Sequence, residues 1–159
     1  MKPIFLATLT LMLALFSGCS PQDSPAAKNS PAVELPWTTD LPKALMAAKA
    51  ENKMVLLDFT GSDWCPWCIK FDQEALDTEK FSDYAKAHLE LVQLDFPNTK
   101  PQDAGLKAAN AALQKQYNVD GFPTYVLLNA DGKELGRQVG YAKGGPEAFI
   151  AELNGFGKK

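Results

Sequence analysis

The sequence has few of the residues from which metal centres and nucleic-acid-binding surfaces are built. Its 159 residues include three cysteines and a single histidine, His88. Structural zinc needs four ligands, which His88 and distant carboxylates do not supply, so a two-thiolate copper(I) site is the only metal alternative. Lysine and arginine together number 16 against 19 acids, with no basic stripe, so a nucleic-acid-binding surface is not expected.

The sequence also lacks an apolar run long enough to span a bilayer comfortably. The apolar run at residues 4–16 follows Lys2 and is typical of the central region of a secretory signal. Ser17 and Gly18 then precede Cys19, a pattern that resembles a bacterial lipobox. We therefore expect residues 1–18 to be a lipoprotein signal peptide and the thiol of Cys19 to be lipidated; plain secretion is the alternative.

Proline and small polar residues dominate the segment that follows. Residues 20–36 contain four of the 11 prolines, so we expect residues 19–36 to be the lipidated cysteine and a flexible tether. The tether would hold a domain of residues 37–159 at the periplasmic side of a bacterial membrane. Disulfides persist outside the cytoplasm, and with Cys19 acylated only Cys65 and Cys68 remain to pair.

The hydrophobic pattern predicts that helices and strands alternate through the domain. We expect helices over residues 39–52, 69–76, 78–88, 103–117 and 145–153, and strands over 54–59, 89–96, 124–128 and 134–139. Strands separated by helices and then a hairpin indicate an α/β fold with a mixed central sheet covered by helices on both faces. The packed helix faces are expected to include Ile69, Phe71, Ala75 and Leu76 in the second helix and Leu106, Ala109 and Leu113 in the fourth.

The cysteines stand three apart in the sequence Cys-Pro-Trp-Cys. If Cys65 begins a helix, Pro66 takes the first helical position and Cys68 lies one turn on, at disulfide distance. The helix start stabilises a thiolate, so we expect Cys65 to be the nucleophile and Cys68 the resolving cysteine. Desolvation should raise the pKa of Asp58 and make it a proton acceptor for Cys68. Asp63 either opposes the thiolate with its charge or is a solvated loop acid.

Two stretches carry a resemblance to a known family, VLLDFTGSDWCPWCIKF and VDGFPTYVLLNADGKELGRQVGY. Together they resemble the thioredoxin superfamily over residues 37–156. The resemblance implies a thioredoxin-like fold, a cis bond before Pro123, a buried acid at Asp58 and a protein disulfide as substrate, with no cofactor. The residues expected to contact substrate are Trp64, Pro66, Trp67, Phe122, Pro123 and Thr124.

The additional helix at 78–88 and the long stretch from 97 to 116 narrow this resemblance. They are similar to the periplasmic thioredoxin-like reductases, which include DsbH-type proteins and the C-terminal domain of the transmembrane thiol–disulfide interchange reductase. The implied function is a membrane-tethered thiol–disulfide oxidoreductase that reduces protein disulfides and is itself reduced by a membrane thiol–disulfide reductase. The alternatives are an oxidase or isomerase of the same fold, or a copper(I)-binding or docking lipoprotein without redox turnover.

Overall fold

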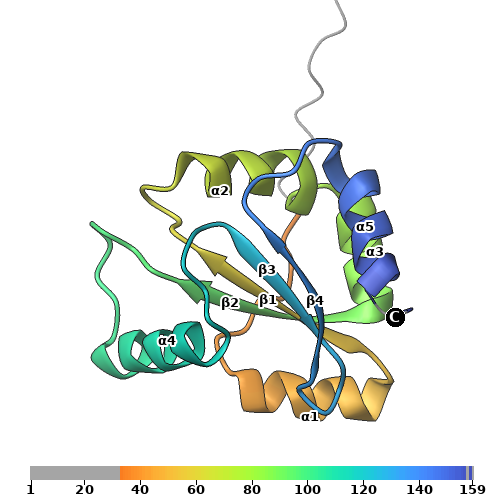
Figure 1. Ribbon diagram of the computed structural model, residues 1–159, viewed down its shortest axis with the longest axis horizontal. Helices are drawn as coiled ribbons and strands as arrows, with labels where there is room; N and C mark the ends of the chain where they lie inside the picture. Colours follow the sequence, from red (N-terminus) through yellow and green to blue (C-terminus); the bar gives the residue numbers. More distant parts are fainter. Residues whose placement is uncertain (1–32, 157, 159) are drawn as a thin grey trace, which may run out of the picture.

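The computed structural model describes residues 33–156 and residue 158 (Figure 1). The expected signal peptide, Cys19 and the tether up to residue 32 lie outside the described residues. Within the described part of the chain, no helix combines the length and apolar character needed to cross a bilayer. The elements are α1 (Leu41–Glu51), β1 (Met54–Thr60), α2 (Pro66–Phe71), a π-helical turn η1 (Asp72–Leu76), α3 (Glu79–His88), β2 (Leu89–Asp95), α4 (Ala104–Gln116), β3 (Thr124–Leu128), β4 (Glu134–Val139) and α5 (Gly145–Phe156).

The four strands form one mixed sheet in the order β2-β1-β3-β4. The central strand β1 runs parallel to β2 and antiparallel to β3, and β3 pairs with β4 as a hairpin. Helices α2, α3 and α5 lie on one side of the sheet, and α1 and α4 lie on the other (Figure 1). The expected α/β architecture is therefore confirmed.

Local sequence signals set the ends of the elements. Asp40 caps α1, because its carboxylate accepts a hydrogen bond from the backbone N–H of Lys43 at 2.9 Å. Asn52 ends the same helix in the left-handed conformation, with a φ of 53°. In the β3–β4 turn, the side-chain oxygen of Asn129 accepts from two later backbone N–H groups, and Gly132 supplies a φ of 82°.

Two hydrophobic clusters fill the space on either side of the sheet. The α2-side core is formed by Leu35, Leu56, Phe71, Ala75, Leu76, Phe81, Ala85, Leu89, Leu91, Tyr125, Leu127, Phe149 and Leu153. The α1-side core is formed by Leu41, Ala44, Ala48, Val55, Leu57, Phe59, Val92, Leu94, Tyr117, Val119, Val126 and Leu128. The split follows from β1, whose alternate side chains point to opposite faces of the sheet.

The packing differs from the sequence-based expectation at three places. Leu35 is buried in the α2-side core, so the last residues assigned to the tether belong to the domain. Ile69 is exposed, because only Cys68 and Phe71 of α2 face the sheet. In α4 the expected Ala109 is exposed and its neighbour Asn110 is buried. Its amide donates a hydrogen bond to the carbonyl of Asp95 at the end of β2, so α4 meets the sheet through a polar contact.

Candidate active site

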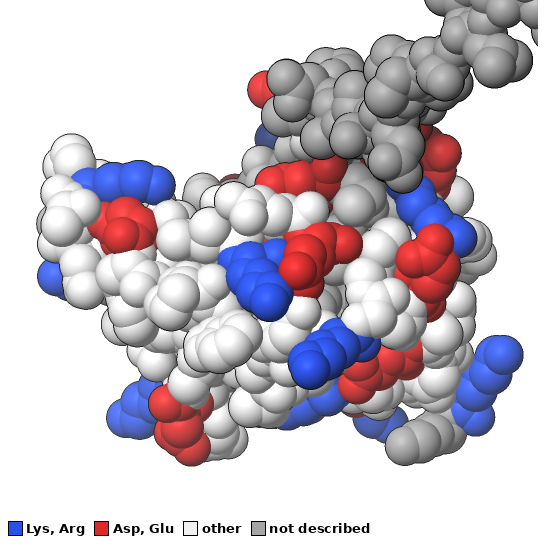
Figure 2. Space-filling model, turned by 90° about the horizontal axis from the view of Figure 1, so that it is seen from above, with Lys and Arg blue, Asp and Glu red and all other residues white. Residues whose placement is uncertain are grey.

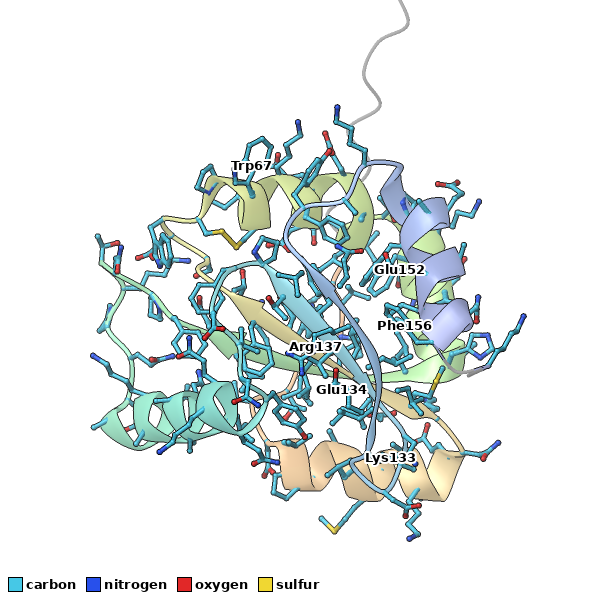
Figure 3. All side chains as sticks on the ribbon, in the orientation of Figure 1. Trp67, Lys133, Glu134, Arg137, Glu152 and Phe156 are labelled. Atoms are coloured by element: carbon cyan, nitrogen blue, oxygen red, sulfur yellow. A yellow bond between two sulfur atoms is a disulfide. The ribbon has the colours of Figure 1, made fainter. Side chains whose placement is uncertain are left out.

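A disulfide between Cys65 and Cys68 lies at the N-terminal end of α2 (Figure 3). Cys65 is the N-cap residue, and its sulfur accepts a hydrogen bond from the backbone N–H of Cys68 at 3.2 Å. Pro66 follows in the first turn, where it helps to start the helix. Cys65 is 4% exposed and Cys68 is fully buried. Of the two cysteines, only Cys65 therefore keeps any contact with the protein surface.

The loop before Cys65 is fastened to the loop between β2 and α4. The backbone N–H and hydroxyl of Ser62 both donate to the carboxylate of Asp95, at 2.9 and 2.6 Å. The indole N–H of Trp64 donates to the carbonyl of Phe96 at 2.7 Å. Gly61 is needed here, because a side-chain carbon at this position would overlap the Trp64 indole. The loop that presents Cys65 is therefore fixed from the side of β2.

Asp63 is the third residue of this loop that bonds to the β2–α4 loop. Its carboxylate accepts hydrogen bonds from the backbone N–H groups of Asn98, Thr99 and Lys100 and from the hydroxyl of Thr99. The Thr99 hydroxyl, followed by these backbone groups, lowers the pKa of Asp63 below its ordinary value. Asp63 is thus ionised and holds the 98–100 loop through hydrogen bonds. Its position in the sequence did not indicate this role, because its partners lie about 35 residues away.

Phe122 and Pro123 are joined by a cis peptide bond, as the resemblance implies. The Phe122 ring lies between Phe96, which it stacks on at 5.0 Å, and Trp64, which it meets edge-on at 6.0 Å between ring centroids. This aromatic trio holds the Pro123 loop beside the loop that carries Cys65. Trp64 is exposed, yet its hydrogen bond and ring contact make it a structural brace as well as a surface residue.

The proposed substrate contacts Phe122, Pro123 and Thr124 differ in which of their hydrogen-bonding groups are already used within the protein. The carbonyl of Pro123 accepts a hydrogen bond from the N–H of Gly140 at 2.8 Å, and proline has no N–H of its own. Phe122 is therefore the residue of the pair whose backbone can bond to a peptide. Thr124 is buried, and its hydroxyl donates to the carbonyl of Gly121 at 2.8 Å. The structure does not place the Thr124 side chain on the substrate-facing surface.

The exposed side chain of Trp67 pairs with the partly buried ring of Tyr141 in the loop after β4. Trp67 projects outward from α2 (Figure 3), and its ring lies 5.3 Å from that of Tyr141, with a hollow of about 290 Å³ lined by the two residues. The ammonium group of Lys70 lies over both rings, at 5.7 and 5.1 Å from their centroids. The Tyr141 hydroxyl also donates to Glu74. Sequence reasoning missed Tyr141, because no motif marks the loop after β4.

Two buried acids lie on the α2 side of the sheet, one on β1 and one at the end of α2. Asp58 on β1 is fully buried, and desolvation, followed by the charge of Asp72, raises its pKa well above the ordinary value. Asp72 stands one helical turn after Cys68, at the start of η1. Burial, followed by the charges of Asp77 and Asp95, raises its pKa to about 7. Asp58 was expected from the sequence, whereas Asp72 was not.

The surface around α2 has no dominant charge. Seen from the α2 side, basic and acidic side chains are interspersed, with uncharged residues between them (Figure 2). In the part of the chain that the structure describes, no three or more histidine, cysteine, aspartate or glutamate residues are grouped to hold a metal ion.

Comparisons with known proteins agree with this geometry. A thioredoxin-like domain family matches residues 41–156. The disulfide bond reductase DsbH of Chlamydia pneumoniae is 38% identical over 122 residues, which cover 77% of this chain and 72% of that protein. A solved structure of the DsbH oxidoreductase has a TM-score of 0.72 at 37% identity, and the match covers 88% of this chain and 94% of that one. The thiol:disulfide interchange protein DsbD of Vibrio cholerae is 34% identical over 97 residues, 61% of this chain but 15% of that protein.

The fold, the cysteine pair and these similarities define the class of protein. The chain belongs to the thioredoxin-like family. It is a thiol–disulfide oxidoreductase, and its residues Cys65 and Cys68 form a disulfide at the start of α2. The resemblance inferred from the sequence is thereby confirmed.

Proposed function

We propose that this protein is a membrane-tethered reductase of protein disulfides that works outside the cytoplasm. The Cys65 thiolate attacks one sulfur of a substrate disulfide, forming a mixed disulfide and releasing the other sulfur as a thiolate. Asp58 takes the proton of Cys68, and the Cys68 thiolate then attacks the Cys65 sulfur. The second substrate thiol leaves, and two electrons have passed from the dithiol to the substrate. A membrane thiol–disulfide reductase would supply the two electrons that restore the dithiol.

The observation that carries the proposed direction is the pair of acids, Asp58 and Asp72, on the α2 side of the sheet. A disulfide oxidises its partners strongly when the reduced form is stabilised, as a very acidic nucleophilic thiol does. Here Asp58 and Asp72 would oppose negative charge on sulfur when they ionise, and the ammonium group of Lys70 lies over aromatic rings. The reduced form gains little stabilisation, so the pair should give up its electrons readily. The relative named as a disulfide bond reductase supports the same direction.

Substrate contacts follow from the surface around Cys65. The backbone of Phe122 would pair with an extended peptide. Pro66, Trp67 and Pro123 would border the sulfur of Cys65. Trp67 and Trp64 are both exposed and give the rim an apolar character. A partner would therefore be held by a short stretch of backbone pairing and by apolar contacts next to its cysteine.

A redox titration tests the proposed direction. The protein is equilibrated with mixtures of reduced and oxidised glutathione, and the fraction of Cys65–Cys68 disulfide is read by alkylation and mass. We expect a reduction potential of about −270 mV, the value of a reducing thioredoxin, together with reduction of insulin. A potential near about −120 mV, as in a strong oxidant, would overturn the reductase assignment and favour an oxidase.

The membrane tether is tested by lipid labelling. Cells that express the full chain are grown with labelled palmitate and separated into membrane and soluble fractions. We expect the label and the protein in the membrane fraction, and loss of the label in a Cys19→Ser variant. An unlabelled protein found in the soluble periplasmic fraction would contradict the tether and favour plain secretion.

A further inference from the structure

A row of four polar residues crosses the sheet beneath α2. The strand registers pair Asp58 with Gln93, Asp58 with Tyr125, and Tyr125 with Gln138. Directly paired residues point to the same face of a sheet, so these side chains form one line across all four strands. This line is flanked on its face by apolar residues such as Leu56 and Leu127.

Tyr125 is the member of this row whose chemistry the reaction has not yet used. It is 1% exposed, and its ring packs against Phe71 at 4.8 Å and Phe149 at 5.1 Å between centroids. Among the described residues, its hydroxyl has no hydrogen-bond partner, and neither does one carboxylate oxygen of Asp72. The carboxylate of Asp58 makes no hydrogen bond of good geometry either, although the Gln93 side chain beside it lowers its pKa and only partly offsets the effect of burial. Buried polar groups are seldom left unpaired, because each costs free energy comparable to a lost hydrogen bond.

The charges around the Tyr125 hydroxyl are all negative or neutral. Burial, followed by the charges of Asp58 and Asp72, raises the pKa of Tyr125, so the hydroxyl stays protonated and remains a donor throughout the pH range of the reaction. α3 and α5 contribute the apolar rings of Phe81 and Phe149 to this side of the core. The titratable groups that face the buried space are Asp58 on β1, Asp95 on β2, Cys68 on α2, and Asp72 and Asp77 at the two ends of η1.

We propose that Tyr125 is a positioning residue: its hydroxyl, which is unpaired in the disulfide form of the protein, donates a hydrogen bond to the Asp58 carboxylate when that acid is ionised and ready to receive the Cys68 proton. The inference rests on the proposed role of Asp58. Tyrosine is a donor that the acids cannot deprotonate, whereas the acids are acceptors when ionised. A hydrogen bond to the ionised form stabilises it, which keeps an otherwise desolvated acid able to act as a base near neutral pH. The rings of Phe71 and Phe149, which pack against that of Tyr125, fix the direction in which the hydroxyl points.

Gln138 is the competing acceptor in the row, since its carbonyl oxygen also lacks a partner among the described residues. Its amide group, however, donates to the carbonyl of Gly140 at 3.1 Å, which turns the side chain toward the end of β4. Asp58 lies on the other side of Tyr125, on the neighbouring strand β1. We therefore assign the hydrogen bond of the Tyr125 hydroxyl to Asp58. A hydrogen bond to Gln138 is the alternative that the test distinguishes.

The test compares Tyr125→Phe with Tyr117→Phe, a matched loss of a tyrosine hydroxyl in the α1-side core. All variants carry Cys19→Ser, so that Cys65 and Cys68 are the only thiols. The reduced protein is mixed with excess DTNB: attack by Cys65 releases the first thionitrobenzoate, and closure of the disulfide by Cys68 releases the second. The rate of the second release is followed from pH 5 to 9, and thermal melting confirms that each variant is folded.

We expect Tyr125→Phe to move the midpoint of the pH profile up by about one unit, the size of one hydrogen bond to a charged group. Tyr117→Phe should leave the midpoint unchanged, and Asp72→Asn should move it down, because that variant removes a negative charge beside Asp58. A midpoint for Tyr125→Phe equal to or below that of the parent would overturn the proposal, as it would if the hydroxyl were bonded to Gln138. Failure of the proposed function would look different, because it would appear as an oxidising potential of the parent in the glutathione titration and would leave the relative pH midpoints of these variants unchanged.

Discussion

The two faces of the central sheet are formed by alternate residues of the same strands, yet they differ in chemistry. On β1, Leu57 and Phe59 enter the α1-side core, while Asp58 faces α2 and the disulfide. The α1-side core contains apolar residues and a tyrosine, whereas the α2 side also contains a row of polar groups, among which Asp58 and Tyr125 have raised pKa values. The comparison shows that one face mainly stabilises the fold, while the other accepts a cost in stability for reactivity. Adjacent residues should therefore respond to substitution in opposite ways.

The largest effect is expected on the stabilising face, from Phe59→Ala. Its ring is fully buried, so the substitution should lower the free energy of unfolding by about 3–5 kcal/mol through lost burial and a cavity. Urea unfolding measures this loss. The redox potential should stay within about 30 mV of the parent value, because the cysteine pair lies on the other face. A loss below about 1 kcal/mol, or a large change in potential, would contradict the division between the faces.

Asp58→Ala, one residue away, should have the opposite effect on stability. The folded-state pKa of Asp58 lies above the unfolded value of 3.8. As the pH rises above about 4, the unfolded state therefore loses this proton before the folded state does, and the fold loses stability. Removing the carboxylate should raise the melting temperature at pH 8 by several degrees, and this gain should disappear below about pH 4. The Cys68-dependent release of thionitrobenzoate should slow by about a hundredfold. A variant that melts lower at pH 8 and resolves at the parent rate would remove Asp58 from the reaction.

These two residues also show how far the sequence could lead. The apolar run of β1 predicted a strand buried on both faces, and a lone acid within it pointed to Asp58. The Cys-Pro-Trp-Cys motif similarly predicted Cys65 as the cap of a helix. These features were readable because each depends on neighbours within a few residues.

Other features depend on contacts between distant segments. Asp72 follows Cys68 by one turn and has the appearance of an exposed helix acid, until the π-helical turn and the sheet enclose it. Tyr125 sits in an apolar run and has the pattern of an ordinary core residue, until the strand registers place it opposite Asp58. Asp63 acquires its role only when the 98–100 loop folds over it. Pairing between strands and loop closure are set by the whole fold, so sequence periodicity did not reveal them.

The smallest effect should come from the exposed surfaces on the two sides of the sheet. Trp67 beside the disulfide and Met46 on α1 are 55% and 68% exposed, which makes Met46→Ala a matched control for Trp67→Ala. We expect Trp67→Ala to lower kcat/KM for insulin reduction by about fivefold, since an aromatic contact contributes about 1 kcal/mol. The rate with the small substrate DTNB should change little, and Met46→Ala should change neither rate. Equal effects of the two variants would show that the aromatic pair does not contact the substrate.

The central claim is that Cys65 attacks the partner and that the buried Cys68 resolves the intermediate. The most direct test is to react the reduced Cys68→Ser and Cys65→Ser variants, in the Cys19→Ser background, with a disulfide substrate and weigh the products. The account predicts that Cys68→Ser rapidly forms a stable mixed disulfide through Cys65, at least about tenfold faster than Cys65→Ser reacts. Faster reaction of Cys65→Ser, through Cys68, would contradict it.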